Sequence, residues 1–384
     1  MSKVSLVKCS EYELSSLKEA INLSLESIGG VDKFAKKGAK VLLKPNVMMP
    51  KKSSFPVNTH PLFIQAVIEI FKEKGAKIIV GESSAGSQAG ITFTKKALKT
   101  SGIEDVVNKT GAKLVNFDFD EVIMTKINNP YAKSIPIAKA VLEADLVVSL
   151  PKLKTHIYGN IITGAIKNMY GTVPGQIKAE YHRLAPEPEQ FYTIIRDIFK
   201  ATKTGLTIFD AIEAMEGDGP SAGKPRYVGF IIASEDSVAA NAVASELVGI
   251  PSLRVLTTKF CAEANIGKGN LKEIEVVGEE LKKVALKNFK LPTSTVINPY
   301  LYRFILNMTK TQPVINHKKC SLCQICADSC PMGVIEEKEK KMIINYDECI
   351  SCFCCSEVCP SQAIKAKRKF IIGNILSKVI SSRW

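Results

Sequence analysis

The chain has 384 residues, 46% hydrophobic and 23% charged, which is typical of a globular protein long enough for two or three domains. No run of eighteen apolar residues occurs, so no membrane-spanning helix is expected. The N-terminal residues lack the apolar core of a signal peptide and carry an early acid, Glu11, which predicts a cytoplasmic protein.

The formal net charge of +14 is unevenly distributed. Residues 320–364 contain three lysines and seven acids, whereas residues 365–384 contain six Lys and Arg and no acid. Residues 1–319 therefore carry +12, which predicts an anionic small-molecule substrate or cofactor, or an anionic surface, as a partner. Aromatic residues make up only 7% and no nucleic-acid-binding motif occurs, so nucleic acid is not an expected partner.

The first 280 residues alternate between short apolar runs and helical patterns. The sequence predicts strands at residues 39–43, 77–80, 113–117, 145–150, 206–209 and 227–233. It predicts helices at residues 11–28, 61–74, 94–101, 137–143, 188–201 and 237–248. Continuous apolar strands that alternate with helices predict an α/β domain at residues 1–285, with a mostly parallel sheet covered by helices.

The last hundred residues divide into three segments. Residues 286–312 contain prolines and are predicted to be a linker, and a small α+β ferredoxin-like domain is predicted at residues 313–364. Residues 365–384 are basic, and their apolar side chains recur at the spacing of one helix face. They predict an amphipathic tail helix, which either packs on the protein or makes a peripheral membrane contact.

Nine of the eleven cysteines are clustered near the C-terminus, and Cys9 and Cys261 stand alone. The pattern Cys-x2-Cys-x2-Cys-x3-Cys-Pro occurs twice, from Cys320 to Pro331 and from Cys349 to Pro360. Such clustering in a cytoplasmic protein favours metal ligation over disulfides. Three cysteines at two-residue gaps also differ from the paired spacing of zinc ribbons.

This spacing is typical of two [4Fe–4S] clusters, where three cysteines of one run bind one cluster and the fourth binds the other. Cluster one is predicted to use Cys320, Cys323, Cys326 and Cys359, and cluster two to use Cys349, Cys352, Cys355 and Cys330. Cys354 fits neither set and is either a buried free thiol or, if the loop slips, a ligand. The segment resembles bacterial-type two-[4Fe–4S] ferredoxins over about fifty residues, which implies one-electron transfer at low potential.

Polar residues that follow predicted strands are candidate site residues, because ligands of parallel sheets bind beyond the carboxyl ends of the strands. Lys44 and Asn46 follow the strand at residues 39–43. Ser83 and Ser84 lie in a glycine-containing turn after the strand at residues 77–80, where backbone N–H groups can face an anion. A plain tight turn is the alternative interpretation.

Lys152, Lys154 and His156 alternate directly after the strand at residues 145–150, and Lys167 follows. An extended chain places the alternating three side chains on one face. They are interpreted as an anion clamp or an acid–base set, with a solvated strand edge as the alternative.

Asp210 begins an acidic segment, residues 210–220, that is predicted to be a loop and that can hold a cation or act as a base. A solvated turn is the alternative. His60, His156 and His182 are predicted to lie in polar loops outside the helical patterns, and they are candidates for general bases or, if they converge, for a shared metal site.

Several of these segments together resemble a widespread prokaryotic family with a large domain of unknown function, often fused to a ferredoxin module. The resemblance covers most of residues 1–365 and implies an iron–sulfur protein, without naming a substrate. It rests on Lys44–Asn46, Thr59–Pro61, Gly81–Gly86, Pro151–His156, Lys167–Gly171 and Glu216–Pro220.

The sequence thus favours a ferredoxin-coupled oxidoreductase that receives electrons from a redox partner protein. An anionic substrate would be held by Lys44, Lys152, Lys154 and Lys167, with Asn46, Ser83 and Ser84 nearby. His156 or His60 would supply protons, and Asp210 would hold a cation or act as a base. The alternative is an electron carrier or adapter without chemistry of its own, which docks an acidic partner or a membrane surface.

Overall fold

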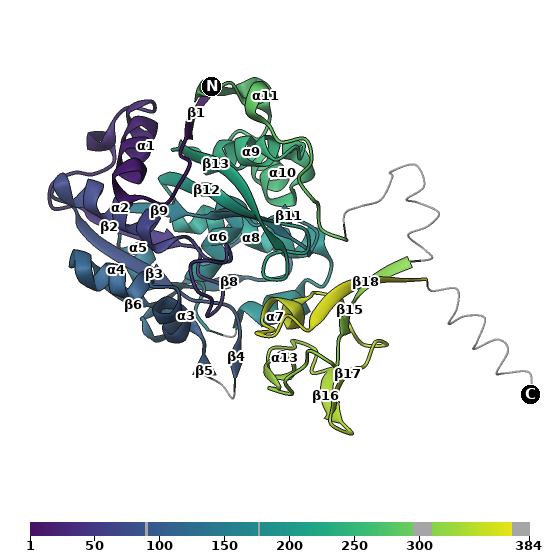
Figure 1. Cartoon of the computed structure of the whole chain (residues 1–384). Helices are drawn as coiled ribbons and strands as arrows, with labels where there is room; N and C mark the ends of the chain where they lie inside the picture. Colours follow the sequence, from purple (N-terminus) through teal and green to yellow (C-terminus); the bar gives the residue numbers. More distant parts are fainter. Residues whose placement is uncertain (89–90, 176, 295–308, 371–384) are drawn as a thin grey trace, which may run out of the picture.

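The computed structural model describes residues 1–88, 91–175, 177–294 and 309–370. A large α/β body carries a small cysteine-rich module, drawn in green and yellow at the lower right of Figure 1. The arrangement confirms the predicted fold class, a mostly parallel sheet covered by helices with a small C-terminal domain.

The main sheet follows the order β14-β1-β13-β12-β9-β2-β3-β6, and the short strands β10 and β11 extend from β12. Five of the neighbouring pairs on this path are parallel, and the two pairs that β13 makes are antiparallel. The strand bounds are β1 Ser2–Lys8, β2 Lys40–Pro45, β3 Lys77–Glu82, β6 Lys113–Asn116, β9 Leu146–Leu150, β10 Lys152–His156, β11 Ile161–Ile162, β12 Leu206–Glu216, β13 Lys224–Ser234 and β14 Ile274–Gly278. Two hairpins lie outside this sheet, β4 Ser87–Gln88 with β5 Ile91–Thr92, and β7 Val122–Lys126 with β8 Ser134–Ala138.

Helices cover both faces of the sheet (Figure 1). Their bounds are α1 Leu14–Glu26, α2 Pro61–Glu73, α3 Thr94–Thr100, α4 Ile103–Thr110, α5 Lys139–Leu142, α6 Gly164–Asn168, α7 Ile177–Leu184, α8 Pro188–Thr202, α9 Ser237–Leu247, α10 Leu256–Glu263 and α11 Leu281–Val284. Helix α2 begins at Pro61, whose fixed φ suits the first helical position, and the His60 ring accepts the Leu62 N–H as its cap.

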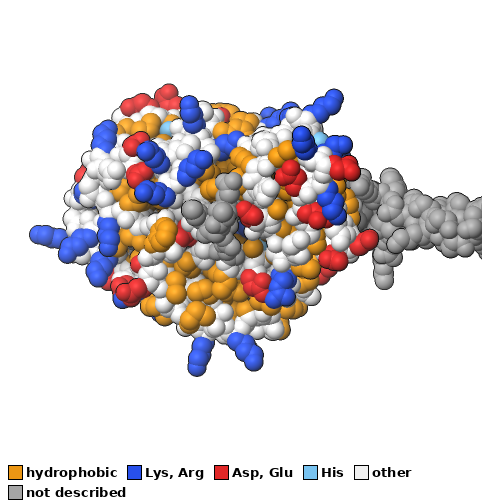
Figure 2. Space-filling model, turned by 90° about the horizontal axis from the view of Figure 1, so that it is seen from below, with side chains coloured by type: hydrophobic (Ala, Val, Ile, Leu, Met, Phe, Trp, Pro, Cys, Tyr) orange, Lys and Arg blue, Asp and Glu red, His pale blue; other side chains and the backbone are white. Residues whose placement is uncertain are grey.

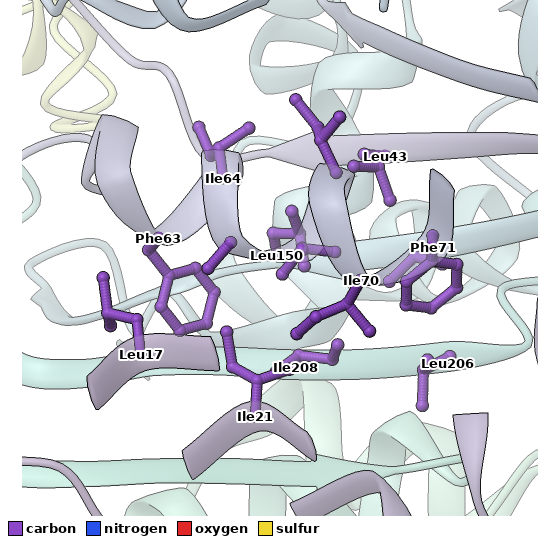
Figure 3. Close-up of a cluster of buried hydrophobic side chains, with 14 of the residues drawn as sticks. Leu17, Ile21, Leu43, Phe63, Ile64, Ile70, Phe71, Leu150, Leu206 and Ile208 are labelled. Atoms are coloured by element: carbon purple, nitrogen blue, oxygen red, sulfur yellow. The ribbon is translucent and has the colours of Figure 1, made fainter. Parts of the chain in front are cut away.

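The core explains why the strand sequences read as continuous apolar runs. Figure 3 shows Leu17 of α1 and Phe63 of α2 in one apolar cluster with strand residues such as Leu43 and Leu150. Successive strand side chains point to opposite faces, so Leu42 instead joins the second core, with Phe191 of α8. Because both faces are buried, alternation between apolar and polar residues is absent from these described strands.

The module contains two short antiparallel pairs and two single-turn helices. Strand β15 (Thr309–Ile315) pairs with β18 (Ile364–Phe370), and β16 (Ile335–Lys338) pairs with β17 (Lys341–Ile344). Helices α13 (Ile325–Asp328) and α14 (Cys354–Glu357) each lie within one cysteine run. The two runs therefore occupy equivalent positions in the module.

Several sequence predictions differ from the structure, and one of them is the loop position of His182, which lies on helix α7. Residues 137–138 complete strand β8 because they pair with β7, so the helix predicted at 137–143 shrinks to α5. The predicted loop at 210–220 is largely strand, since β12 stays paired with β13 as far as Glu216. Residues 365–370 form strand β18 instead of helix, and its partner β15 takes residues 309–312 of the predicted linker.

The rest of the predicted tail helix, residues 371–384, lies outside the described residues. Across the part of the chain that the structure describes, no helix has the length and apolar character needed to cross a membrane.

Candidate functional site

The two cysteine runs fold into loops with the same backbone pattern. Leu322 and Gln324 of the first run have φ values of 57° and 60°, and Ser351 and Phe353 of the second run have 55° and 62°. Left-handed conformations are costly for residues other than glycine and persist where the surrounding structure requires them. Because the same conformations occur in both runs, the two loops are inferred to curve tightly around bound groups of the same kind.

Each loop encloses a small cavity lined by cysteine thiols. One cavity is lined by Cys320, Cys323, Cys326 and Cys359. The other is lined by Cys330, Cys349, Cys352 and Cys355, with Cys354 beside them. Each foursome joins three cysteines of one run to the fourth of the other, and all of these thiols are free of disulfides. Four thiols around an enclosed space fit the ligand set of a [4Fe–4S] cubane.

The module docks on the body through a shared core and direct hydrogen bonds. Phe353, only 3% exposed, belongs to the same apolar core as Phe191 of α8. Gln362 Nε2 donates to Ser221 O at 2.7 Å, and Lys51 Nζ donates to Pro360 O at 3.1 Å. Apolar burial and polar contacts thus fix the second cysteine run against the body.

A cavity of about 290 Å³ lies between the body and the module. This volume is at the lower end of the range for small-molecule sites. The body contributes three lysines to its wall, and the module contributes two cysteines and, besides Asp328, the carboxylate of Glu357. These six residues are Lys154, Lys167, Lys178, Cys330, Cys354 and Glu357.

The topology explains how the cavity is assembled. Strands β2 and β3 are parallel neighbours, so their carboxyl ends deliver Asn46 and Ser83 to one edge of the sheet. Strand β10 supplies Lys154 and His156, and helices α6 and α7 each add a lysine. Residues of both cysteine runs then close the space from the other side.

Unpartnered polar atoms are concentrated on this wall. Among the described residues, nine buried side-chain nitrogen or oxygen atoms have no hydrogen-bond partner, and six of them belong to residues that line the cavity. Buried polar groups are normally hydrogen-bonded, so this concentration indicates a site for a polar ligand. The six atoms are Asn46 Oδ1, His156 Nε2, Thr163 Oγ1, His182 Nδ1, Ser329 Oγ and Glu357 Oε1.

His156 and Glu357 meet across the interface. His156 Nε2 lies 3.2 Å from Glu357 Oε1, although the two atoms are not aligned as a hydrogen bond. Nδ1 accepts the Tyr158 N–H, so the neutral ring carries its proton on Nε2. Burial and the nearby Lys167 lower the pKa of His156 to about 4. Burial alone would raise the pKa of Glu357, but His156 and Lys167 outweigh it and lower that pKa to about 2.

The lysines of the wall keep most of their donors free of carboxylates. Burial, reinforced by Lys167, lowers the pKa of Lys154 to about 7, and its Nζ donates to Val57 O at 2.7 Å. Burial lowers the pKa of Lys178 to about 8, and its Nζ donates to Val173 O at 2.8 Å. Lys167 has no hydrogen bond or salt bridge among the described residues and lies 5.3 Å from the centre of the Tyr170 ring. An anionic ligand would supply the opposite charge and the hydrogen-bond acceptors that these ammonium groups lack.

Two predicted site residues are placed close to the cavity without lining it. Lys44, fully buried, forms a 2.8 Å ion pair with Glu82, and Glu82 does line the cavity. Ser84 is also buried, and its backbone N–H donates to Thr94 Oγ1. Ser83, by contrast, is on the wall, where its hydroxyl accepts from Lys178 Nζ at 2.5 Å.

Three other predicted residues form a separate network, in which Lys152 and Asp210 are buried and His60 is half-buried. Asp210 accepts from Lys152 Nζ at 3.0 Å, from the backbone N–H of His60 at 2.9 Å, and from Tyr12 OH at 2.7 Å. The Tyr12 and His60 rings stack at 3.9 Å. None of these four described residues lines the cavity. Their saturated contacts give the network a role in holding β10, β12 and α2 together.

The predicted trio of Lys152, Lys154 and His156 is therefore split between two places. Strand β10 pairs with β12 through Asp210 and Met215, with a register shift between Lys152 and Lys154. That irregularity turns Lys152 toward Asp210, while Lys154 and His156 remain at the cavity. Simple alternation along an ideal strand does not anticipate such a shift.

Sequence reasoning missed Lys178 and Glu357. Lys178 and His182 stand four residues apart on α7, which places them on one helix face, and this spacing was the available signal. Glu357 lies inside the second cysteine run, between Cys355 and Cys359, and nothing in the sequence connects it with His156. Of the three histidines considered together, His156 and His182 line the cavity, and His60 lies in the separate network.

Residues 41–246 match the family described as "Domain of unknown function (DUF362)". The chain belongs to the DUF362 family. Residues 312–360 of this DUF362 protein match a second family, the "4Fe-4S dicluster domain". That match confirms the prediction of two [4Fe–4S] clusters and, with it, a module suited to electron transfer.

Individual proteins resemble this DUF362 protein to different extents. It is 30% identical over 292 residues to "Thylakoid-associated protein sll1697" of Synechocystis sp., covering 75% of this chain and 87% of the relative. The structure of the lactate racemase apoprotein from Thermoanaerobacterium thermosaccharolyticum aligns with a TM-score of 0.44 and 16% identity. That alignment covers 65% of this chain and 57% of the racemase chain.

Proposed function

We propose that this DUF362 protein is a ferredoxin-coupled oxidoreductase that reduces or oxidises a small anionic molecule in the interdomain cavity. One observation carries the proposal: Cys330 of the second cysteine set and the cationic Lys154 and Lys167 line the same cavity. When bound, the clusters supply or accept single electrons. The ligand-binding wall and the electron source are thus adjacent.

The wall residues have distinct roles in this proposal. Lys167 and Lys178 bind the anion by charge, because neither has a salt bridge among the described residues. His156 donates a hydrogen bond from Nε2 to the anion, and the Tyr158 N–H, which Nδ1 accepts, keeps the ring oriented. Lys154, with a pKa of about 7, is the proton donor, since a general acid works best near the ambient pH.

The lowered pKa of Lys154 predicts a pH dependence. The anion is bound with the protonated lysine, so its affinity is highest below pH 7 and falls as the pH rises through about 7. Replacing Lys154 by Met is expected to weaken binding and to remove this dependence between about pH 6 and 8. The measurement is the KM for the most active anion across that range. An unchanged pH profile in K154M contradicts the assignment.

The proposed function is tested with anaerobically reduced protein and a panel of small organic and inorganic anions. We expect at least one anion to reoxidise the clusters, and we expect K167M to slow that reoxidation by about 100-fold or more. K126M, which changes an exposed lysine of strand β7, is the matched control. If every anion fails, or if K167M and K126M behave alike, the proposal is wrong.

A non-catalytic electron carrier is the second candidate, and the basic excess of the body favours it. Figure 2 shows, however, that on the face seen from below, cationic side chains are interspersed with acidic and hydrophobic ones. A carrier also gives no role to the unpartnered polar atoms of the cavity. A redox partner protein and a cytoplasmic location belong to both proposals. In the reoxidation experiment, a carrier would respond to a partner protein alone.

A further inference from the structure

We propose that His182, Cys352 and Cys354 form a mononuclear site for a thiophilic divalent transition-metal ion, beside cluster two and open to the interdomain cavity. One ligand atom of each residue lies within 4.8 Å of the other two. The site joins helix α7 of the body to the second cysteine run. It shares Cys352 with the four-thiol set of cluster two and adds His182 and Cys354, which belong to neither set.

Cys354 is the one thiol of the second small cavity that is not needed as a cluster ligand. Five cysteines line the second small cavity, whereas a cubane takes four thiolate ligands. Cys354 also lines the interdomain cavity, so its thiol lies between the two spaces. The left-handed backbone of Phe353 turns the chain between Cys352 and Cys354, which allows both thiols to approach the same imidazole.

The surroundings of the His182 ring support the metal site independently of the cysteines. Its side chain is only 4% exposed, it lines the interdomain cavity, and its Nδ1 has no hydrogen-bond partner among the described residues. The ring is held by stacking on Phe191 at 3.9 Å and by an edge contact with Tyr158. A buried, oriented imidazole nitrogen without a partner is costly unless a ligand occupies it. A metal ion accounts for both the burial and the fixed orientation.

Two thiolates and one imidazole are a known ligand set of metal sites that keep a fourth position open. Zinc–sulfur bonds of about 2.3 Å and zinc–nitrogen bonds of about 2.0 Å place the ligand atoms of a tetrahedral site roughly 3.5–3.8 Å apart. A contraction of about 1 Å therefore closes the present arrangement around an ion. The Cys352 thiolate would bridge this ion and cluster two.

The open position faces the interdomain cavity, because Cys354 and His182 line it. Resting on the proposed function, we assign the ion a Lewis-acid role that polarises the anionic substrate next to Lys167. The proposed metal site itself does not depend on the proposed function.

The test uses Zn²⁺ alone as the probe, added to the full-length, cluster-loaded protein under anaerobic conditions. We expect about one zinc per chain in addition to about eight irons, with X-ray absorption at the zinc edge showing sulfur near 2.3 Å and nitrogen near 2.0 Å. We expect C354S and H182Q to lower zinc affinity by more than about 100-fold while the iron content and the signal of the reduced clusters stay unchanged. C9S, which alters a buried thiol in the other core, is the control.

Two outcomes would contradict the proposed metal site. One is zinc binding that is absent from the parent protein or unaffected by both variants. The other is loss of about half the iron from C354S, which would make Cys354 a cluster ligand. Neither readout uses a substrate, so failure of the reoxidation experiment leaves this result unaffected.

Discussion

Replacing Cys359 by Ala is expected to remove cluster one, although Cys359 belongs to the second cysteine run. Its thiol lines the cavity of Cys320, Cys323 and Cys326. Iron content should fall from about eight to about four per chain, because a cubane with three thiolates in place of four is labile. Adding C320A should cost no further iron, whereas adding C349A should remove the remaining cluster.

The double variants distinguish crossed from uncrossed ligation of the two clusters. If the ligands were not crossed, C349A/C359A would retain about four irons and C320A/C359A would lose both clusters. C9A is the matched control, because Cys9 lies in the core beside α1 and lines neither small cavity of the module. Iron analysis and the absorbance of the anaerobic protein are the measurements.

Replacing Lys44 by Met is expected to destabilise the body by about 3–5 kcal/mol, because it leaves the buried Glu82 carboxylate without its counter-charge. Glu82 also accepts backbone N–H groups from Val47 and Ser83, so the change loosens the turn that carries Ser83 at the cavity. The measurement is anaerobic unfolding of the cluster-loaded protein followed by circular dichroism.

A second substitution separates charge from packing. K44M/E82Q removes both charges and is expected to recover much of the lost stability. K18M breaks a partly exposed pair with Glu73 and should cost less than about 1 kcal/mol. Equal effects of K44M and K18M would show that the buried pair contributes little to stability.

The sequence was sufficient to predict the clusters and most of the sheet. Cluster ligation depends on short-range spacing, and Cys-x2-Cys-x2-Cys-x3-Cys-Pro defines it within a dozen residues. Strands β2, β3, β6 and β9 were predicted within a few residues, because burial on both faces leaves an apolar run that is readable locally. The strand continuation of β12 past Asp210 was missed, since its pairing with β13 overrides the local acidic composition.

Only the tertiary structure decided which polar residues share a site. Lys152 and Lys154 are two residues apart, yet one pairs with Asp210 and the other faces the cavity, because the register of β10 against β12 shifts between them. His156 and Glu357 lie in different domains, and docking of the cysteine-rich module brings them to 3.2 Å. Spacing along the chain therefore predicts the ligands of the clusters, whereas contacts between distant segments determined the cavity beside them.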